Sequence, residues 1–145
     1  MFSYKSTVSY TMRACLIMLA MVSAGPLFAD SQVFVSFSMP ERLLEETLAE
    51  SARLHIPANL NGLVNDSMPD TIARITALSE RVPDLSLQID PTAFERYNIT
   101  QVPALVVDTG DCFDVIYGTR TLTENLNRIA RSGACARQSS LEGAR

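Results

Sequence analysis

The stretch that decides the fold is residues 33–44, which read VFVSFSMPERLL. Val33–Phe37 is a continuous β-prone apolar run, the pattern of a strand that is buried on both faces. Ser38 fits the N-cap of a helix, Glu41 follows three positions later as in a capping box, and Pro40 falls in the first turn. The stretch therefore predicts a buried strand that leads through a tight turn into a helix.

The same helix-opening pattern occurs a second time, at Ser67-Met68-Pro69-Asp70. A strand candidate precedes each copy, Val33–Phe37 in one case and Ala58–Val64 in the other, and an amphipathic run follows. The predicted inward positions are Leu43, Leu44, Leu48, Ala52 and Leu54 in the first run and Ile72, Ile75, Leu78 and Val82 in the second. Two successive strand–helix units of this size predict a parallel sheet.

The rest of the chain predicts a third strand, a hairpin and a closing helix. Asp84–Asp90 alternates as a strand, Pro91 opens a short helical turn, and Ala104–Asp108 is joined through turn residues to Phe113–Tyr117. Thr121 or Thr123 caps the last helix, and residues 133–145 form a flexible polar tail. The predicted order is β-α-β-α-β-(α)-β-β-α, which is one α/β domain at residues 30–132 with a mixed central sheet flanked by helices.

Residues 1–29 have the composition of a secretory signal peptide. Lys5 and Arg13 precede the apolar run Ala14–Val22, and Ala29 is a small residue before a polar segment. We predict export to the periplasm and cleavage after Ala29, with Met1 or Met12 as the start. An uncleaved anchor or a buried helix is the alternative, but the run is shorter than the roughly 20 apolar residues that span a bilayer. No stable membrane insertion is expected after cleavage.

Cleavage would leave an acidic chain. Residues 1–29 carry two of the 12 basic residues and none of the 16 acidic ones, so the mature chain has 10 against 16, a net charge of −6, and no lysine. Nucleic-acid binding needs a basic stripe, and we therefore expect no nucleic-acid partner. Gly62, Gly110 and Gly118 stand alone rather than in a nucleotide-binding loop, and no small-molecule substrate is expected.

The mature chain keeps two cysteines, Cys112 and Cys135, which have three interpretations. A structural disulfide is favoured, since an exported protein permits one and its closure would stabilise by about 3 kcal/mol. The alternatives are free thiols or pairing with a partner protein, and a catalytic redox pair. The redox interpretation is disfavoured because the two are not spaced as Cys-x-x-Cys and neither opens a helix.

No pattern of catalytic or metal-ligating residues stands out. His55 is the single histidine and lies where the first helix ends, a position more typical of a helix-terminal charge than of a metal ligand. Ser36, Ser38 and the acidic residues show no spacing diagnostic of a nucleophilic site. We therefore expect no catalytic residue, no cofactor and no metal.

Pro103 stands directly before the strand Ala104–Asp108, and proline in a sheet is confined to strand starts and edges. A trans proline at a strand start is one interpretation. The predicted element order, however, resembles the thioredoxin-like fold, in which a cis proline at this point faces the turn between the first strand and helix. We therefore expect a cis Val102–Pro103 bond. Redox-active members carry Cys-x-x-Cys in that turn, whereas this chain has Ser38-Met39-Pro40-Glu41.

The chain more specifically resembles the TrbC family, the pilin assembly proteins of F-type conjugative transfer (type IV secretion) systems. The resemblance spans about residues 32–132. It is carried by Ser36-Phe37-Ser38-Met39-Pro40, by Asn61-Gly62-Leu63, by Asp90-Pro91 through Phe94, Tyr97 and Ile99 to Val102-Pro103-Ala104, and by Gly118, Leu122, Leu126 and Ile129. One departure is Asn61, where family members often have a basic residue.

The resemblance implies a non-enzymatic periplasmic assembly factor for the conjugative pilus, acting through contacts with pilus-assembly proteins such as a TraW-like partner. The surface that holds an extended chain in redox-active relatives corresponds here to Ser36, Ser38, Met39, Pro40, Gln101, Val102, Pro103 and Ala104. We expect this surface to bind a partner segment by β-augmentation. The alternatives are a periplasmic thiol-disulfide oxidoreductase or isomerase, and a general peptide-binding chaperone.

Overall fold

A computed structural model describes residues 30–135 of the chain. Its elements are β1 (Asp30–Val35), α2 (Glu41–Arg53), β2 (Ala58–Leu60), the 3-10 turn η1 (Val64–Asp66), α3 (Met68–Arg81), β3 (Leu87–Ile89), α4 (Pro91–Arg96), β4 (Ala104–Asp108), β5 (Phe113–Tyr117) and α5 (Leu122–Ser132). The order of strands and helices is the predicted one. The predicted signal peptide lies outside the described residues.

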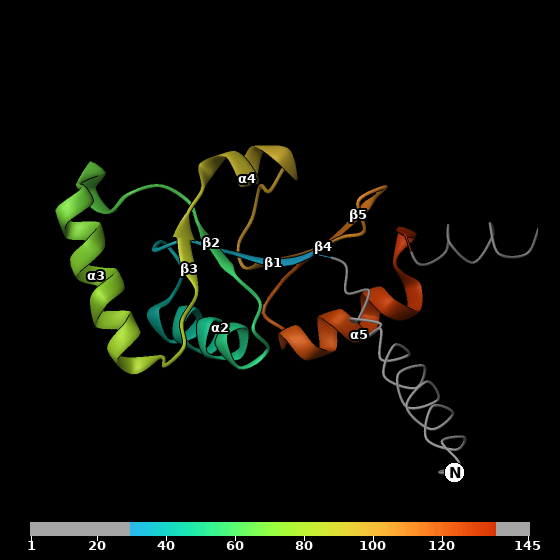
Figure 1. The fold of residues 1–145 in the computed structure, drawn as a ribbon, viewed down its shortest axis with the longest axis horizontal. Coiled ribbons are helices and arrows are strands. Elements are labelled where there is room, and N and C mark those ends of the chain that lie inside the picture. Colours follow the sequence, from blue (N-terminus) through green and yellow to red (C-terminus); the bar gives the residue numbers. More distant parts are fainter. Residues whose placement is uncertain (1–29, 136–145) are drawn as a thin grey trace, which may run out of the picture.

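The five strands form one mixed sheet in the order β3-β2-β1-β4-β5. β1 pairs in parallel with β2, β2 pairs in parallel with β3, and β4 runs antiparallel to both β1 and β5. In Figure 1 α4 covers one face of the sheet, α2 and α5 cover the other, and α3 lies beyond β3 at the end of the sheet. This arrangement is the thioredoxin-like fold, as predicted. In it, a central strand is followed by a helix and has a parallel neighbour on one side and an antiparallel hairpin on the other.

β1 is the centre of the core because both faces of the sheet are covered. Val33, Phe34 and Val35 have no exposed surface, in agreement with the continuous apolar run of the sequence. Alternate side chains of this strand enter different clusters. Val33 and Val35 pack with the buried residues of α2 and α5, and Phe34 packs edge-on against Phe94 of α4 with ring centroids 4.9 Å apart.

Two strands are shorter than the sequence predicts, because turns with positive φ interrupt them. β2 ends at Leu60 instead of continuing to Val64, since the chain turns at Gly62, whose φ is +74°. β3 begins at Leu87 instead of Asp84, which has a φ of +59°.

One predicted inward position of α3 is wrong. Ile72, predicted to point inward, is 55 % exposed, whereas Leu78 on the same helix is 1 % exposed.

The end of the described chain is attached to the sheet. Cys135 is bonded to Cys112, and the backbone N–H groups of Ala134 and Cys135 donate to the Asp114 carboxylate at 2.7 and 3.2 Å. Ala134 and Cys135, which belong to the predicted tail, are therefore fixed to the sheet by these contacts. Residues 136–145 of the predicted tail lie outside the described part of the chain.

Candidate functional site

The turn between β1 and α2 is stabilised by its own serines. The Ser36 and Ser38 hydroxyls lie 3.0 Å apart, the Ser38 N–H donates to Ser36 Oγ at 3.2 Å, and the Met39 N–H donates to the Ser36 carbonyl at 3.1 Å. The predicted Ser38 cap is wrong. α2 begins at Glu41, Pro40 occupies the N-cap position, and no side chain caps this end of the helix.

The Val102–Pro103 peptide bond is cis, as predicted. The sheet register places Ala104 opposite Phe34, so the loop before β4 lies beside the chain that leaves β1. The Pro103 carbonyl accepts a hydrogen bond from the Gly118 N–H at 3.1 Å, which anchors the loop to the end of β5. Met39 belongs to the core cluster against which Val102 packs. The structure thus brings together the two segments that the sequence analysis grouped.

The predicted surface residues differ in accessibility. Ser38, Pro40 and Gln101 are exposed, and Ser36 and Val102 are half-buried. Met39, Pro103 and Ala104 are buried, so their side chains support the two loops from below rather than meet solvent.

The Val102 backbone forms no hydrogen bond with another described residue. Its N–H and C=O groups therefore have no partner among the described residues, in a bend directly before β4. Unpaired backbone groups beside a sheet can take up a further strand.

Phe37 and Arg74 lie beside this surface and are not among its predicted residues. Phe37, in the turn itself, is half-buried, and the guanidinium of Arg74 on α3 lies 4.6 Å from the centre of its ring. A cation over an aromatic face stabilises by roughly 0.5–1 kcal/mol at an exposed site. The contact connects the turn to α3, and no local sequence signal could have identified it because the two residues come from different elements.

A small cavity adjoins the other side of the cis-proline loop. Its volume is about 80 Å³, and α2, the start of β4 and α5 line it. Asn125 is 2 % exposed on its wall, and its side-chain oxygen has no hydrogen-bond partner among the described residues. Small-molecule sites usually have volumes above about 300 Å³, so this cavity is the size of a single side chain.

Glu50 stands on the wall of the same cavity and caps α5. Its carboxylate accepts hydrogen bonds from the Leu122 N–H at 2.7 Å, the Thr123 N–H at 3.1 Å and the Thr123 hydroxyl at 2.9 Å. Burial alone raises the pKa of this carboxyl, but those hydrogen bonds and the nearby Arg53 charge outweigh it, so the pKa is lowered overall. Thr121, one of the two predicted caps, accepts from the Glu124 N–H at 3.2 Å.

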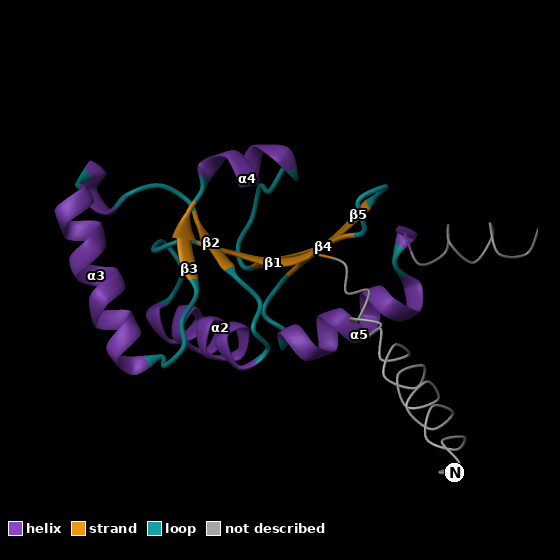
Figure 2. Ribbon diagram, viewed as in Figure 1, coloured by secondary structure: helices purple, strands orange, loops and turns teal. Residues whose placement is uncertain are grey.

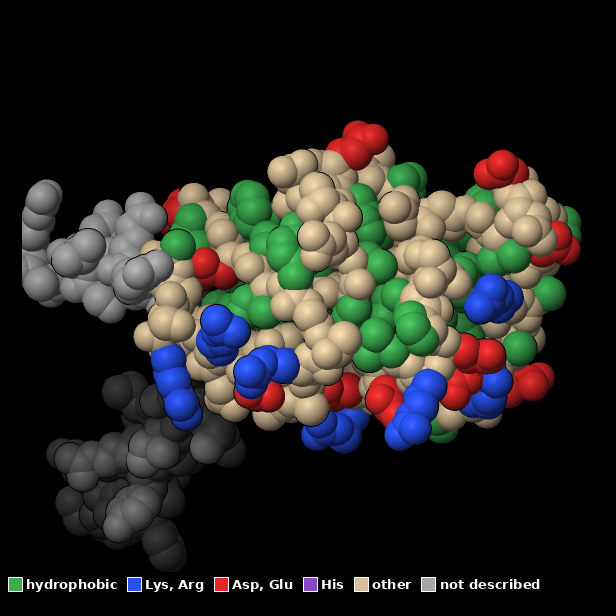
Figure 3. Space-filling model, turned by 180° about the vertical axis from the view of Figure 1, so that it is seen from behind, with side chains coloured by type: hydrophobic (Ala, Val, Ile, Leu, Met, Phe, Trp, Pro, Cys, Tyr) green, Lys and Arg blue, Asp and Glu red, His purple; other side chains and the backbone are tan. Residues whose placement is uncertain are grey.

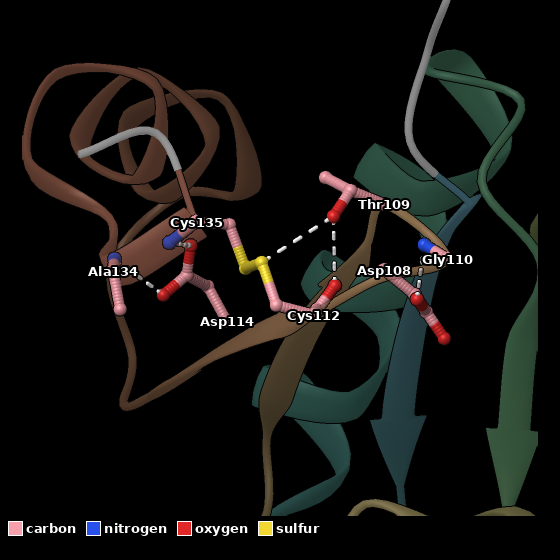
Figure 4. The surroundings of a disulfide bond; sticks show 7 residues. All are labelled: Asp108, Thr109, Gly110, Cys112, Asp114, Ala134 and Cys135. Carbon is pink, nitrogen blue, oxygen red and sulfur yellow. Dashed lines mark hydrogen bonds between the residues drawn. A yellow bond between two sulfur atoms is a disulfide. The ribbon is translucent and has the colours of Figure 1, made fainter. Parts of the chain in front are cut away.

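Cys112 and Cys135 form a disulfide, with their Cα atoms 5.9 Å apart. Figure 4 shows Asp114 between this bond and the end of α5, where it accepts from Ala134 and Cys135. Cys112 lies beyond the C-terminal end of β4, whereas Pro103 lies before its N-terminal end. At about 3.3 Å per residue, the strand holds the disulfide on the order of 20 Å from the cis-proline loop.

The charged side chains of α2 and α5 are interleaved on the surface. Figure 3 shows blue and red side chains mixed along the edge that carries these two helices. Arg42 pairs with Glu46, and Arg120 pairs with Glu124. Within residues 30–135 there is no group of three or more His, Cys, Asp or Glu side chains that could hold a metal ion. None of the helices in that range is long and apolar enough to cross a membrane.

The fold and the site define a thioredoxin-like domain in which Ser38-Met39-Pro40-Glu41 replaces the Cys-x-x-Cys turn. The model of the type-F conjugative transfer system pilin assembly protein family, TrbC, matches residues 33–142, and the chain belongs to this family. The predicted family is thereby confirmed.

Two individual proteins are similar to the chain. The periplasmic protein TrbC of Escherichia coli K12 is 39 % identical over 102 residues, which cover 70 % of this chain and 48 % of that protein. The chain thus spans about half the length of this curated relative. A solved structure of MTB DsbF in mixed oxidised and reduced forms has a TM-score of 0.47 and 16 % identity, covering 70 % of this chain and 78 % of its own.

Proposed function

We propose that this protein is a periplasmic assembly factor for the conjugative pilus of an F-type secretion system and that it acts by holding another protein, without catalysis. Family membership and the relative's name, periplasmic protein TrbC, support the process and the compartment. The N-terminal signal pattern supports export.

One observation carries the proposal of binding without catalysis. The β1–α2 turn and the cis-proline loop lie together with an unpaired Val102 backbone, but Ser38 and Glu41 stand where a thiol pair would be. A partner segment in extended conformation would add hydrogen bonds to Val102 and lie across Ser38 and Gln101. Pilus-assembly proteins of the periplasm are the expected partners, a TraW-like protein first among them.

The alternative is a thiol-disulfide oxidoreductase that uses Cys112 and Cys135. The observation that favours it is that these two residues do form a disulfide. Its distance from the turn and the loop argues against it, because a redox pair must meet the chain that the surface binds.

The first experiment measures conjugative transfer and counts pili after in-frame deletion of the gene and complementation. The wild-type chain and a Cys112→Ser/Cys135→Ser variant that still accumulates are both expected to restore transfer and pili. Transfer and piliation that do not change on deletion, with no duplicate gene, would contradict the assembly role. Restoration by wild type alone, with the variant accumulating normally, would favour thiol chemistry.

The second experiment tests the surface. Ser38→Arg and Gln101→Arg alter exposed positions of the turn and the loop, and Gln88→Arg alters an exposed position on β3 as a matched control. The first two variants are expected to lose partner co-purification and pili while they stay folded, and the control is expected to keep both. If all three folded variants keep the partner, the partner does not bind at this surface.

A further inference from the structure

β5 is an open edge of the sheet. β4 pairs with one side of it, and no described strand pairs with the other. Figures 1 and 2 show β5 as the last strand of the sheet, with α4 over one face and α5 over the other.

The hydrogen bonds at the two ends of the hairpin identify the free backbone groups. Thr109 N–H donates to the Cys112 carbonyl at 2.9 Å, and Gly118 N–H donates to the Pro103 carbonyl at 3.1 Å. Because an antiparallel strand bonds a given neighbour through every second residue, residues 112, 114, 116 and 118 face β4. Phe113, Val115 and Tyr117 therefore direct their N–H and C=O groups to the open edge.

The side chains of the same residues lie on the α4 face, and two of them are large and exposed. Phe113 is 45 % exposed and Tyr117 is 41 % exposed. The Phe113 ring packs edge-on against Tyr97 at 5.1 Å, and the Tyr117 hydroxyl donates to the Asn98 carbonyl at 3.4 Å. Both aromatic side chains are thus held beside the free backbone groups.

The two edges of the sheet differ in how they are protected. β3 is three residues long, and Pro91 follows it closely, both of which discourage further pairing. β5 has five residues and contains no lysine and no proline. Its one charge, Asp114, is already occupied by the N–H groups of Ala134 and Cys135 on the opposite face.

We propose that this edge binds β5 of a second copy of the chain, antiparallel and centred on Val115. The strand reads FDVIY, with an aromatic residue two positions either side of the central valine. Antiparallel pairing about Val115 sets Phe113 opposite Tyr117 of the partner subunit, and Tyr117 opposite the partner's Phe113. Directly opposed aromatic side chains are among the favourable cross-strand pairs.

Opposite charges also stand at the two ends of the hairpin. Asp111 lies before β5 and Arg120 lies after it, and both are exposed. Antiparallel pairing brings Asp111 of one copy towards Arg120 of the other, but Arg120 already pairs with Glu124 of its own chain, so this contact adds little. A second copy of the chain is therefore complementary to this edge in backbone and in aromatic side chains.

Sedimentation of the disulfide-intact chain, purified after export to the periplasm, tests the proposal across a concentration series. We expect a reversible dimer. Phe113→Lys/Tyr117→Lys places like charges opposite each other and should abolish it, whereas Phe113→Lys/Tyr117→Glu places opposite charges there and should retain it. A strictly monomeric wild-type chain would overturn the proposal and leave the edge to a different protein. Equal loss in both folded variants would also overturn it.

A single cysteine gives a measurement that does not depend on those variants folding. Val115→Cys sets two thiols opposite each other across the two-fold axis, with Cβ atoms about 5.5 Å apart as in a hydrogen-bonded pair, a span that a short thiol-to-thiol cross-linker bridges. We expect a cross-linked dimer on a non-reducing gel from this variant and none from Gln88→Cys on the other edge. Cross-linking of neither variant, or of both equally, would contradict the pairing.

Discussion

The carboxylate of Glu50 on α2 accepts a hydrogen bond from the backbone N–H of Leu122 at 2.7 Å, although 72 positions separate them in the chain. Glu50 also accepts from the Thr123 N–H, and the Thr121 hydroxyl accepts from the Glu124 N–H. The first three N–H groups of α5, which an isolated helix leaves unpaired, are thereby satisfied. Glu50 on α2 thus caps the N-terminus of α5.

Glu50→Gln keeps an acceptor oxygen but removes the charge at the start of α5, and should lower the free energy of unfolding by about 0.3–1 kcal/mol at neutral pH. The pKa of Glu50 is lowered below its ordinary value of 4.5, so its contribution is complete above that pH and is lost as the pH falls through the folded-state pKa. Urea denaturation from neutral to acidic pH should show the variant and the wild type converging in acid. A constant difference at every pH would contradict the role of the charge.

Glu46→Gln is the matched control on the same helix. Its partner is Arg42 at 2.8 Å, and the two side chains are 60 % and 90 % exposed. Because solvent screens an exposed pair of this type, this substitution should change neither the stability nor its pH dependence measurably.

Thr71→Val should destabilise the domain although it preserves the shape of the side chain. Thr71 is fully buried, accepts from the Val64 N–H at 2.8 Å and donates to the Ser67 carbonyl at 2.7 Å. Valine would leave the Val64 N–H unpaired, which costs about 1–3 kcal/mol, whereas the Ser67 carbonyl would keep the Thr71 backbone N–H at 3.1 Å. Thr76→Val, at an exposed position of α3, should stay within about 0.5 kcal/mol in the same thermal denaturation experiment.

Leu78→Ala and Ile72→Ala should have very different effects on stability. Leu78 is 1 % exposed in the core and Ile72 is 55 % exposed on the same helix. Truncation of a buried leucine costs about 2–5 kcal/mol, and truncation at an exposed position costs well under about 1 kcal/mol. Comparable shifts of the denaturation midpoint would mean that α3 packs through a different face.

Reduction of the Cys112–Cys135 disulfide should lower the stability by about 3 kcal/mol. The Cys112→Ser/Cys135→Ser variant should show the same loss and should no longer respond to dithiothreitol in denaturant titrations. Stability that reduction leaves unchanged would indicate that the Asp114 hydrogen bonds suffice to hold residues 134 and 135.

Periodicity and turn chemistry were enough to predict the order of the elements, but one tetrapeptide pattern has two different outcomes. Ser67 caps α3 and accepts from the Asp70 N–H at 3.3 Å. Ser38, in the corresponding place, pairs with Ser36, and α2 begins only after Pro40. The difference arises because the chain leaving β1 must first bury Met39, which is 7 % exposed. Tertiary packing therefore overrides the local cap.

The cis proline and the cysteine pair could be predicted because position in the fold and cysteine count constrain them. The Glu50 cap and the contact of Arg74 with Phe37 could not, since each joins elements whose relative placement the sequence does not give. The burial of Ala104, at 2 %, likewise follows from the register of β4 against β1 and β5. The sequence therefore could not show which residues of the predicted partner surface are exposed and which are buried, because that depends on how the strands of the sheet are arranged.

Cys112 and Cys135 lie 23 positions apart in the chain, and the bond between them encloses β5 and α5 in a covalent loop. A single proteolytic cut anywhere between these cysteines would leave both fragments joined, with the aromatic edge of β5 still attached to the domain. In the proposed periplasmic location, which is an oxidising compartment, such a bond would persist. Disulfide closure would therefore make the last part of this domain tolerant of backbone nicking, a property that the segments before β4 do not share.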